Sequence, residues 1–511
     1  MGSVGRVSEV PPTIPAVLAR AVERFGGDEA LVTEGVRLTF AELAARVERA
    51  MGFLQRRGIE PGDRVAIWAP NSPEWAIASL AIHSIGAVLV PLNTRFKGAE
   101  ARYALQTAGV RLLLTVRNFL GTDYVELLGP LEGLDVLDIT AVLDAGDPGR
   151  PADVGPDDLC EIMFTSGTTG APKGAMLRHG ATTGIMTTWA DTVGLERGDR
   201  YLIVNPFFHT FGLKAGILAC LLRGATMLPM PTLDLPAAIA TIEKERITTL
   251  PGAPTLCQTL LDHPDLHRHD LSSLRLAVTG AAMVPVELIR RMREELTFST
   301  ILTAYGLTES TGVVTMCDRD DDDETVATTS GRAIPGVELR TIEPDGTPAP
   351  PGAPGEVVAR GYNVMAGYYG DPDATAAAID ADGWLHTGDV GILDERGNLR
   401  ITDRTKDMFI VGGFNAYPAE IENMIMRNPA VAQVAVVGVP DDRLGEVGMA
   451  FVVPRRDATV DPDALVEWCR AEMANYKVPR QVRVVDALPL NASGKVLKYE
   501  LRTRAQSNVP D

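Results

Sequence analysis

The run from Thr165 to Gly174 has the residue types that hold a polyphosphate. It reads Thr-Ser-Gly-Thr-Thr-Gly-Ala-Pro-Lys-Gly. Its three glycines let the backbone turn tightly and approach an anion closely, its four hydroxyls are short donors, and Lys173 adds a positive charge. It is not a Walker loop, because no Gly-Lys-Ser/Thr ends it and Pro172 stands where a phosphate-binding helix would begin. The loop alone leaves a Ser/Thr/Gly-rich surface turn as the alternative.

Further motifs follow in order at wide spacing. They are Tyr305-Gly306-Leu307-Thr308-Glu309, Trp384-Leu385-His386-Thr387-Gly388-Asp389, Asp403-Arg404-Thr405-Lys406-Asp407, Gly412-Gly413-Phe414-Asn415, Tyr417-Pro418-Ala419-Glu420 and Asn491-Ala492-Ser493-Gly494-Lys495. Over nearly the whole chain, this series resembles the adenylate-forming superfamily of acyl-CoA synthetases, luciferases and peptide-synthetase adenylation domains. The resemblance implies two half-reactions. A carboxylate attacks the α-phosphorus of ATP to give an acyl adenylate and pyrophosphate, and a thiol then displaces AMP.

The resemblance also implies which residues bind the nucleotide. Lys173 belongs to the phosphate loop, and Glu309 is the Mg²⁺ ligand, as suits a hard cation beside phosphates. Tyr305 stacks on adenine, Asp389 accepts from the ribose hydroxyls, and Arg404 assists at ribose and phosphate. The full set implied for ATP or AMP is Thr165, Ser166, Gly167, Thr168, Thr169, Gly170, Lys173, Gly280, Ala281, Ala282, Ala304, Tyr305, Gly306, Thr308, Asp389, Arg404 and Lys495.

Lys495 resembles the family's catalytic lysine, which bridges the attacking carboxylate and the α-phosphate. Acetylation of Lys495 would remove its charge and is expected to switch the enzyme off. Lys406 matches the hinge about which a small domain rotates between half-reactions. The catalytic residues that the resemblance implies are Lys495, Lys173, Glu309 and His209, and those implied to bind CoA are Gly412, Gly413 and Phe414.

Residues 205–216 match the segment in which family members place their acyl pocket. His209 resembles the ring at the carboxylate end of that pocket. Phe211 and Ala215 are four residues apart, so they share one helical face and are predicted to shape the pocket wall. Lys214 departs from the usual apolar character of the segment. We interpret it as a surface residue on the far side of the helix; the alternative is a contact with an oxygen atom of a polar acyl group.

The stretch through Leu222, together with residues 303–309, is most similar to actinobacterial synthetases. Those enzymes thioesterify the hexahydroindanedione propanoate left after degradation of the steroid A and B rings. The expected substrate is therefore a bulky alicyclic acid. A medium- or long-chain fatty or aryl acid ligase, and a stand-alone adenylation enzyme that loads a carrier protein, stay open. These motifs do not distinguish an acyl-CoA synthetase from a luciferase-like oxygenase. A non-enzymatic nucleotide-binding protein is the least favoured alternative, because it would not need Lys173, Glu309 and Lys495 together.

The composition of the chain limits its possible partners and its cellular compartment. A net charge of −19 argues against nucleic acid, because phosphate binding needs an excess of Lys and Arg. No apolar run reaches the roughly 18 residues of a membrane span, and the first residues lack a secretory signal. Five cysteines without CxxC spacing fit a reducing compartment. These features predict a cytoplasmic protein without integral membrane association, whose partners are a carboxylic acid, ATP and CoA. The possibility of a homodimer stays open.

The acidic run at residues 318–324 has contiguous carboxylates and lacks the spaced ligands and the glycine of a calcium loop. It is therefore expected to be a solvated loop without chemistry.

Alternating strand and helix patterns predict parallel sheets covered by helices. Strands are expected at residues 64–68, 87–90, 247–250 and 274–279, and helices at 73–85, at 236–246 and from Pro285. Ligands of such sheets bind beyond the carboxyl ends of strands, which is where Gly280 and Tyr305 fall.

The pattern of predicted strands and helices changes after about residue 403. Short strands at residues 433–439, 450–453 and 482–485 surround a helix at 462–474. At 511 residues the chain exceeds the size of a single hydrophobic core. The prediction is an α/β fold with a large N-terminal domain at residues 1–403, containing helix-covered, mainly parallel sheets. A small mobile α+β domain is predicted at 404–511, with its hinge at 403–407.

Overall fold

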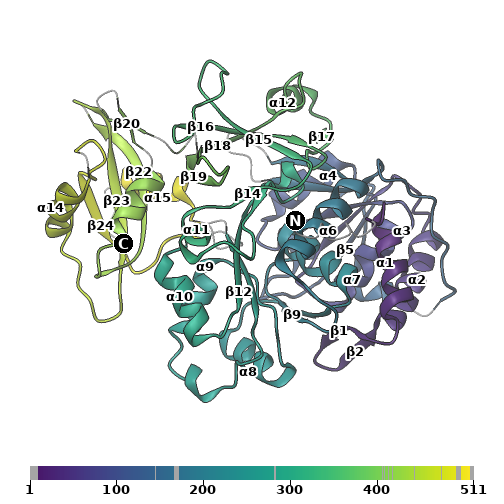
Figure 1. Ribbon diagram of the computed structural model, residues 1–511. Coiled ribbons are helices and arrows are strands. Elements are labelled where there is room, and N and C mark those ends of the chain that lie inside the picture. Colours follow the sequence, from purple (N-terminus) through teal and green to yellow (C-terminus); the bar gives the residue numbers. More distant parts are fainter. Residues whose placement is uncertain are drawn as a thin grey trace, which may run out of the picture. The chain divides into compact units, whose positions relative to one another are not determined.

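The computed structural model shows the chain in two units (Figure 1). The first unit contains the described residues up to Gly280, with 284–338 and 359–385; the second contains 339–358 and the described residues from His386 onward. The structure describes residues 10–143, 146–165, 172–280, 284–404, 407, 409–411, 414–416, 418–441, 443–473, 475–490 and 496–506.

A seven-stranded sheet in the first unit has the strand order β17-β8-β7-β4-β3-β5-β6. Its strands are β3 (Arg64–Trp68), β4 (Val88–Pro91), β5 (Leu112–Thr115), β6 (Asp135–Asp138), β7 (Leu159–Thr165), β8 (Lys173–Arg178) and β17 (Gly367–Tyr368). The strands from β7 to β6 run parallel, whereas β8 is antiparallel to both of its neighbours. The predicted strand-helix-strand unit is confirmed as β3, α3 (Pro73–Ser84) and β4, with the Ser72 side chain capping the helix.

Two four-stranded sheets of the first unit have the orders β2-β1-β10-β9 and β11-β12-β13-β14. Their strands are β1 (Glu29–Thr33), β2 (Val36–Thr39), β9 (Arg200–Ile203), β10 (Thr226–Pro229), β11 (Leu276–Gly280), β12 (Thr300–Tyr305), β13 (Thr315–Met316) and β14 (Arg332–Ala333). The strand predicted at residues 247–250 is reduced to one residue. Thr249 bridges to Tyr201 on one side and to Leu276 on the other, and so connects the two sheets. Pro251, which has no N–H, stands directly after this short segment.

Helices connect and cover these strands. Those of the first unit are α1 (Ile14–Phe25), α2 (Phe40–Arg56), α3, α4 (Gly98–Ala108), α5 (Tyr124–Leu128), α6 (His179–Val193), α7 (Ala219–Arg223), α8 (Leu235–Glu245), α9 (Pro254–Leu261), α10 (Val286–Glu295), α11 (Asp323–Thr328) and α12 (Pro372–Ala378). The helices predicted near residues 236 and 285 are α8 and α10. Helices α4 and α5 pack on one face of the seven-stranded sheet, where the Tyr124 ring stacks on Trp68 with 4.4 Å between centroids.

The acidic run at residues 318–324 is exposed at Asp318, Asp320, Asp322 and Glu324, as expected of a solvated loop, but its last two residues begin helix α11. Asp322 caps helix α11 by accepting from the Thr325 N–H. Asp321 pairs with Arg332 at 3.0 Å and Asp323 with Arg293 at 2.8 Å. The prediction omitted the structural role of these carboxylates, which cap the helix and pair with arginines from a distant strand and helix.

The second unit contains a four-stranded sheet, β15-β16-β18-β19, and a five-stranded one, β21-β20-β23-β22, with β24 beside β23. The strands are β15 (Val337–Ile342), β16 (Pro354–Gly361), β18 (Leu385–Leu393), β19 (Leu399–Arg404), β20 (Phe409–Val411), β21 (Phe414–Ala416), β22 (Val431–Asp441), β23 (Gly445–Pro454) and β24 (Gln481–Val484). Helix α14 (Pro462–Glu472) packs beside β24, and α13 (Pro418–Ile425) and α15 (Lys498–Gln506) pack beside β22 (Figure 1). The expected fold class is confirmed. The second unit includes residues that precede the division predicted at 403, and that division stays a prediction.

Among the described residues, no helix has both the length and the apolar character needed to cross a membrane. All five cysteines lie in the described part of the chain, buried and with free thiols.

Candidate functional site

The β7–β8 hairpin places the two ends of the phosphate-loop motif opposite each other. Thr165 ends β7 and pairs with Lys173, the first residue of β8. The Thr165 hydroxyl donates to the Lys173 carbonyl at 3.4 Å. Gly174 is required by packing, since a Cβ there would come within 2.7 Å of the Ile162 side chain. The other predicted members of this loop, Ser166, Gly167, Thr168, Thr169 and Gly170, lie outside the described residues.

Tyr368 contacts both charged groups predicted for this site. It lies on β17, opposite Ala175 of β8. The Lys173 ammonium is 5.1 Å from the centroid of its ring, and its hydroxyl donates to Glu309 Oε1 at 2.9 Å. Burial and the adjacent Glu309 carboxylate raise the pKa of Tyr368 well above its usual value, so the hydroxyl remains a donor. No sequence pattern predicts a role for Tyr368, because Gly-Tyr-Tyr at 367–369 has no chemical signature of its own.

A tight turn after β12 orients Glu309. The Leu307 N–H donates to the Ser310 hydroxyl at 3.0 Å, and the Glu309 carbonyl accepts from the Met365 N–H at 2.8 Å. Gly306 is needed here, because a Cβ would lie 2.3 Å from the Gly312 carbonyl oxygen. The turn thereby brings Glu309 and Lys173 to the same tyrosine, although they are far apart in the sequence.

Gly280 and Tyr305 end the neighbouring parallel strands β11 and β12, as predicted. Gly280 is in register with Ala304, and a Cβ on Gly280 would come within 2.7 Å of the Ala304 carbonyl oxygen. Tyr305 is half-buried, and its carbonyl accepts from the Val314 N–H at 2.8 Å. Ala281 and Ala282, the other predicted members of the adenine wall, lie outside the described part of the chain.

The predicted acyl-pocket helix is a π-helix, η2 (Phe211–Leu218), in which the Ala219 N–H donates to the Lys214 carbonyl. His209 precedes it, and its Nδ1 accepts from the Phe211 N–H at 3.3 Å. The His209 side chain is accessible to solvent, yet surrounding protein atoms desolvate the ring and lower its pKa. Phe211 is half-buried and Ala215 is buried.

The segment before η2 packs against the turn that carries Glu309. A Cβ on Gly312 would come within 3.3 Å of the Thr210 Cβ. The predicted acyl and magnesium residues therefore belong to adjoining segments of the first unit.

The interpretation of Lys214 as a surface residue was wrong. Its side chain is 0% exposed, and its ammonium lies 3.1 Å from the Glu161 carboxylate, which is also 0% exposed. The ammonium also donates to the Thr182 hydroxyl at 3.3 Å. The helix has no solvent-facing side after its first residue, because all residues from Gly212 to Leu218 are buried.

In the second unit, Asp389 and Arg404 lie opposite each other on the antiparallel strands β18 and β19. Asp389 is buried, and its N–H donates to the Thr387 hydroxyl at 3.1 Å. Phe414 is on β21, opposite Val411. Lys406, Gly412, Gly413 and Lys495 lie outside the described residues.

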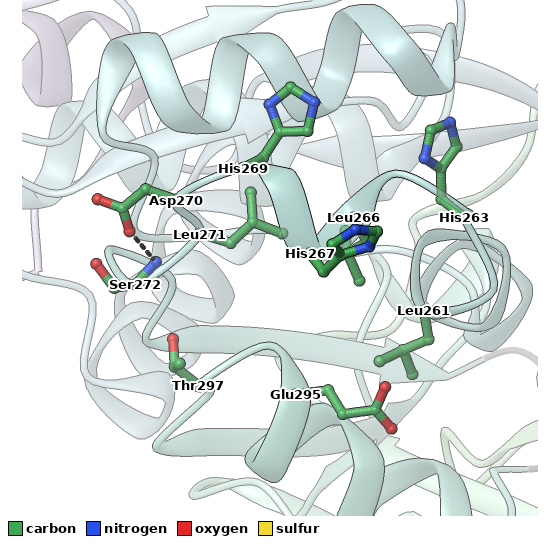
Figure 2. Close-up of a pocket in the computed structure, with 10 residues that line it drawn as sticks. All are labelled: Leu261, His263, Leu266, His267, His269, Asp270, Leu271, Ser272, Glu295 and Thr297. Carbon is green, nitrogen blue, oxygen red and sulfur yellow. Dashed lines mark hydrogen bonds between the residues drawn. The ribbon is translucent and has the colours of Figure 1, made fainter.

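A surface cavity of about 570 Å³ in the first unit is separate from these residues (Figure 2). Its lining residues are Leu261, His263, Leu266, His267, His269, Asp270, Leu271, Ser272, Glu295 and Thr297. His269 Nδ1 lies 2.8 Å from a Glu243 carboxylate oxygen. Within the described ranges, no three His, Cys, Asp or Glu residues are grouped so that they could hold a metal ion. None of the predicted site residues lines this cavity.

The chain belongs to the AMP-binding enzymes. The model of the AMP-binding enzyme family matches residues 18–369, and that of the AMP-binding enzyme C-terminal domain matches 420–495. The solved structure of ATP-bound MatB from Rhodopseudomonas palustris is similar, with a TM-score of 0.88 and 32% identity over 97% of this chain and 99% of that one.

Two curated relatives are 50% identical to this chain. Both are named 3-[(3aS,4S,7aS)-7a-methyl-1,5-dioxo-octahydro-1H-inden-4-yl]propanoyl:CoA ligase. The protein from Rhodococcus jostii (strain RHA1) is matched over 97% of this chain and 99% of its own length, and that from Mycobacterium tuberculosis (strain ATCC 25618 / H37Rv) over 96% and 98%. The expected superfamily and the enzyme class, an AMP-forming acyl-CoA synthetase that uses ATP and CoA, are confirmed.

Proposed function

We propose that this enzyme converts a steroid-derived indanedione propanoate, a bulky alicyclic acid, to its CoA thioester through an acyl adenylate. The observation that carries this proposal is the 50% identity, over almost the full length of each chain, to two ligases named for such an acid. A fatty or aryl acid, and a carrier protein in place of CoA, are the competing outcomes of the test below.

In the first half-reaction the acid attacks the α-phosphorus of ATP and pyrophosphate leaves. Lys173, Thr165 and the loop between them neutralise and orient the phosphates. Glu309 would hold Mg²⁺, which would supply positive charge to neutralise the phosphate oxygens; one protein carboxylate suits this ion, since Mg²⁺ is commonly bound by one or two carboxylates together with phosphates and water. Tyr368 is a neutral donor beside that carboxylate and leaves its negative charge in place. Lys495 bridges the attacking carboxylate and the α-phosphate.

The nucleoside and the acid have separate sets of residues. Tyr305 stacks on adenine opposite Gly280, and Asp389 with Arg404 binds ribose; the remaining nucleotide contacts are Ala281, Ala282, Ala304, Gly306 and Thr308. His209, whose pKa is lowered by the surrounding protein atoms, lies at the carboxylate end of the acyl pocket. Phe211 and Ala215 form part of the pocket wall.

In the second half-reaction the CoA thiol attacks the acyl carbonyl carbon and AMP leaves. Gly412, Gly413 and Phe414 line the channel for the pantetheine arm. The domain from residue 404 to 511 rotates about Lys406 relative to residues 1–403 between the two half-reactions. The enzyme works in the cytoplasm, without integral membrane association.

The proposal is tested with a panel of acids, each assayed with and without CoA. Pyrophosphate release and thioester formation are measured for an indanedione propanoate, a coumarate and saturated fatty acids. We expect the highest kcat/KM for the indanedione propanoate. The highest value for a straight-chain acid would contradict the substrate, and adenylate that never transfers to CoA would favour a carrier protein.

Lys495→Ala tests the role of Lys495. Its charge serves only the first transition state, so adenylate formation should be abolished while CoA transfer to a supplied acyl adenylate is largely spared. Lys244→Ala, on helix α8, is the control. Equal loss of both half-reactions would refute the assignment.

A further inference from the structure

A buried ion pair joins two segments of the first unit that approach the site. Lys214 lies on η2, and Glu161 on β7, with 3.1 Å between Nζ and Oε2 and no exposed surface on either side chain. Neither carboxylate oxygen of Glu161 has a hydrogen-bond partner among the described residues, so the charge of Lys214 is its compensation there. Lys214 also donates to Thr182 on α6. Three elements therefore meet at one pair of charges.

The pair is not explained by stability. Moving two charges out of water costs about as much as their attraction returns, and well-packed apolar residues usually serve a core as well or better. His83, another fully buried residue, gives the pair no hydrogen bond, because its two ring nitrogens have no hydrogen-bond partner in the described structure. Burial lowers the pKa of His83 most, and the charges of His179 and Lys214 lower it further.

Both partners occur at backbone irregularities. The register of β7 against β8 shifts between Leu159 and Glu161, a bulge that can redirect a side chain. Lys214 accepts the Ala219 N–H through its carbonyl in the widened turn of the π-helix. Such turns are rare and frequently lie at functional sites. Two costly local distortions thus bring one ammonium and one carboxylate together.

Glu161 and Lys214 connect the strand that leads to the phosphate loop with the helix of the predicted acyl pocket. Glu161 is on the strand that ends at Thr165, opposite Lys173. Lys214 lies between Phe211 and Ala215, the predicted pocket residues, and directly precedes Ala215. A rotation of η2 about its axis would move both pocket residues, and the attachment of Lys214 to β7 opposes that rotation.

We propose that Glu161 and Lys214 are a positioning pair that fixes η2 against β7 and thereby sets the selectivity of the acyl pocket. This inference rests on the proposed acyl-binding role of His209, Phe211 and Ala215. The pair takes no part in proton or group transfer. Its effect is on which acids fit, and it should leave ATP binding nearly unchanged.

The test is the double variant E161L/K214M, which removes both charges and retains an apolar filling. We expect a folded protein with a KM for ATP within about twofold of the wild type. Its kcat/KM for the acid that the wild type prefers should fall at least tenfold, and its preference for that acid over a short straight-chain acid at least fivefold. The matched control is E287L/R290M, which removes the exposed pair on α10.

A folded double variant with unchanged acid preference would overturn the inference. If the double variant does not fold, E161Q/K214M supplies the measurement, because it removes both charges and keeps the shape of the Glu161 side chain. At least a threefold loss of acid preference is then expected, and an unchanged preference again overturns the inference. The acid that the wild type prefers is measured first, so a wrong substrate in the proposed function is detected separately from a failure of the pair.

Discussion

Two lysines of the first unit, both positioned by the β7–β8 hairpin, differ in burial and in the partner of their ammonium group. Lys173, on β8, is half-buried, with its ammonium over the Tyr368 ring, and no carboxylate of the described chain lies within ion-pair distance of it. Lys214 is fully buried and is neutralised by Glu161 of β7. A charge that already has a buried partner is not available to a ligand and fixes the position of its helix, whereas one that rests only on a ring face is available to a phosphate.

The largest expected effect is the loss of stability in Lys214→Met. This variant leaves Glu161 as an unpaired buried charge and should lower the free energy of unfolding by about 3–5 kcal/mol. Lys173→Met, on a partly exposed side chain, should change it by no more than about 0.5 kcal/mol. Denaturant unfolding of both variants measures the difference. Equal stabilities would show that the two environments do not differ as described.

The second expected effect is on the rate of adenylate formation. Here the substitution of Lys173 should have the larger effect, whereas for stability the substitution of Lys214 does. Lys173→Met should slow adenylate formation about 10²–10³-fold, the usual cost of removing a charged group that stabilises a transition state. ATP–pyrophosphate exchange at saturating acid measures it, with thermal unfolding as the check that the variant is folded. Exchange within twofold of the wild type would remove Lys173 from the catalytic residues.

Tyr368→Phe separates the contribution of the Tyr368 hydroxyl to activity from that of its ring. The ring over Lys173 remains, but Glu309 loses a charge-assisted hydrogen bond, and about a tenfold fall in kcat/KM for MgATP is expected. The Mg²⁺ concentration for half-maximal exchange should shift in parallel. Tyr369→Phe is the matched control on the next residue, and equal effects of the two variants would contradict a role for the Tyr368 hydroxyl.

The smallest expected effect is a pH dependence of the free energy of unfolding, caused by the buried His179 side chain. Burial lowers the pKa of His179 to about 4, and its Nδ1 accepts from the Ile14 N–H at 3.3 Å. The unfolded chain takes up this proton near pH 6.5 and the folded chain does not, so stability falls as the pH is lowered from about 6.5 toward 4. About 1 kcal/mol should be lost between pH 7.5 and 5.5. His179→Asn, measured by denaturant unfolding at both pH values, should lose that part of the dependence; an unchanged slope would contradict it.

The sequence by itself determined features that depend on local chemistry. Strand β3, helix α3 and helix α14 lie where hydrophobic periodicity and turn residues predicted them, because those signals act within a few residues. Gly280 and Tyr305 were placed at strand ends by the same kind of pattern. The order of the motifs was enough to predict the family.

Only the tertiary structure decided which partners those residues have. Tyr368 comes from a short strand far along the chain and contacts Lys173 and Glu309 because β17 pairs with β8. Lys214 is buried because helix α6 and strand β7 cover its helix, which no local pattern around residue 214 encodes. Burial and long-range pairing result from packing of distant segments, and they determine whether a lysine is available to a ligand or is held in a buried ion pair.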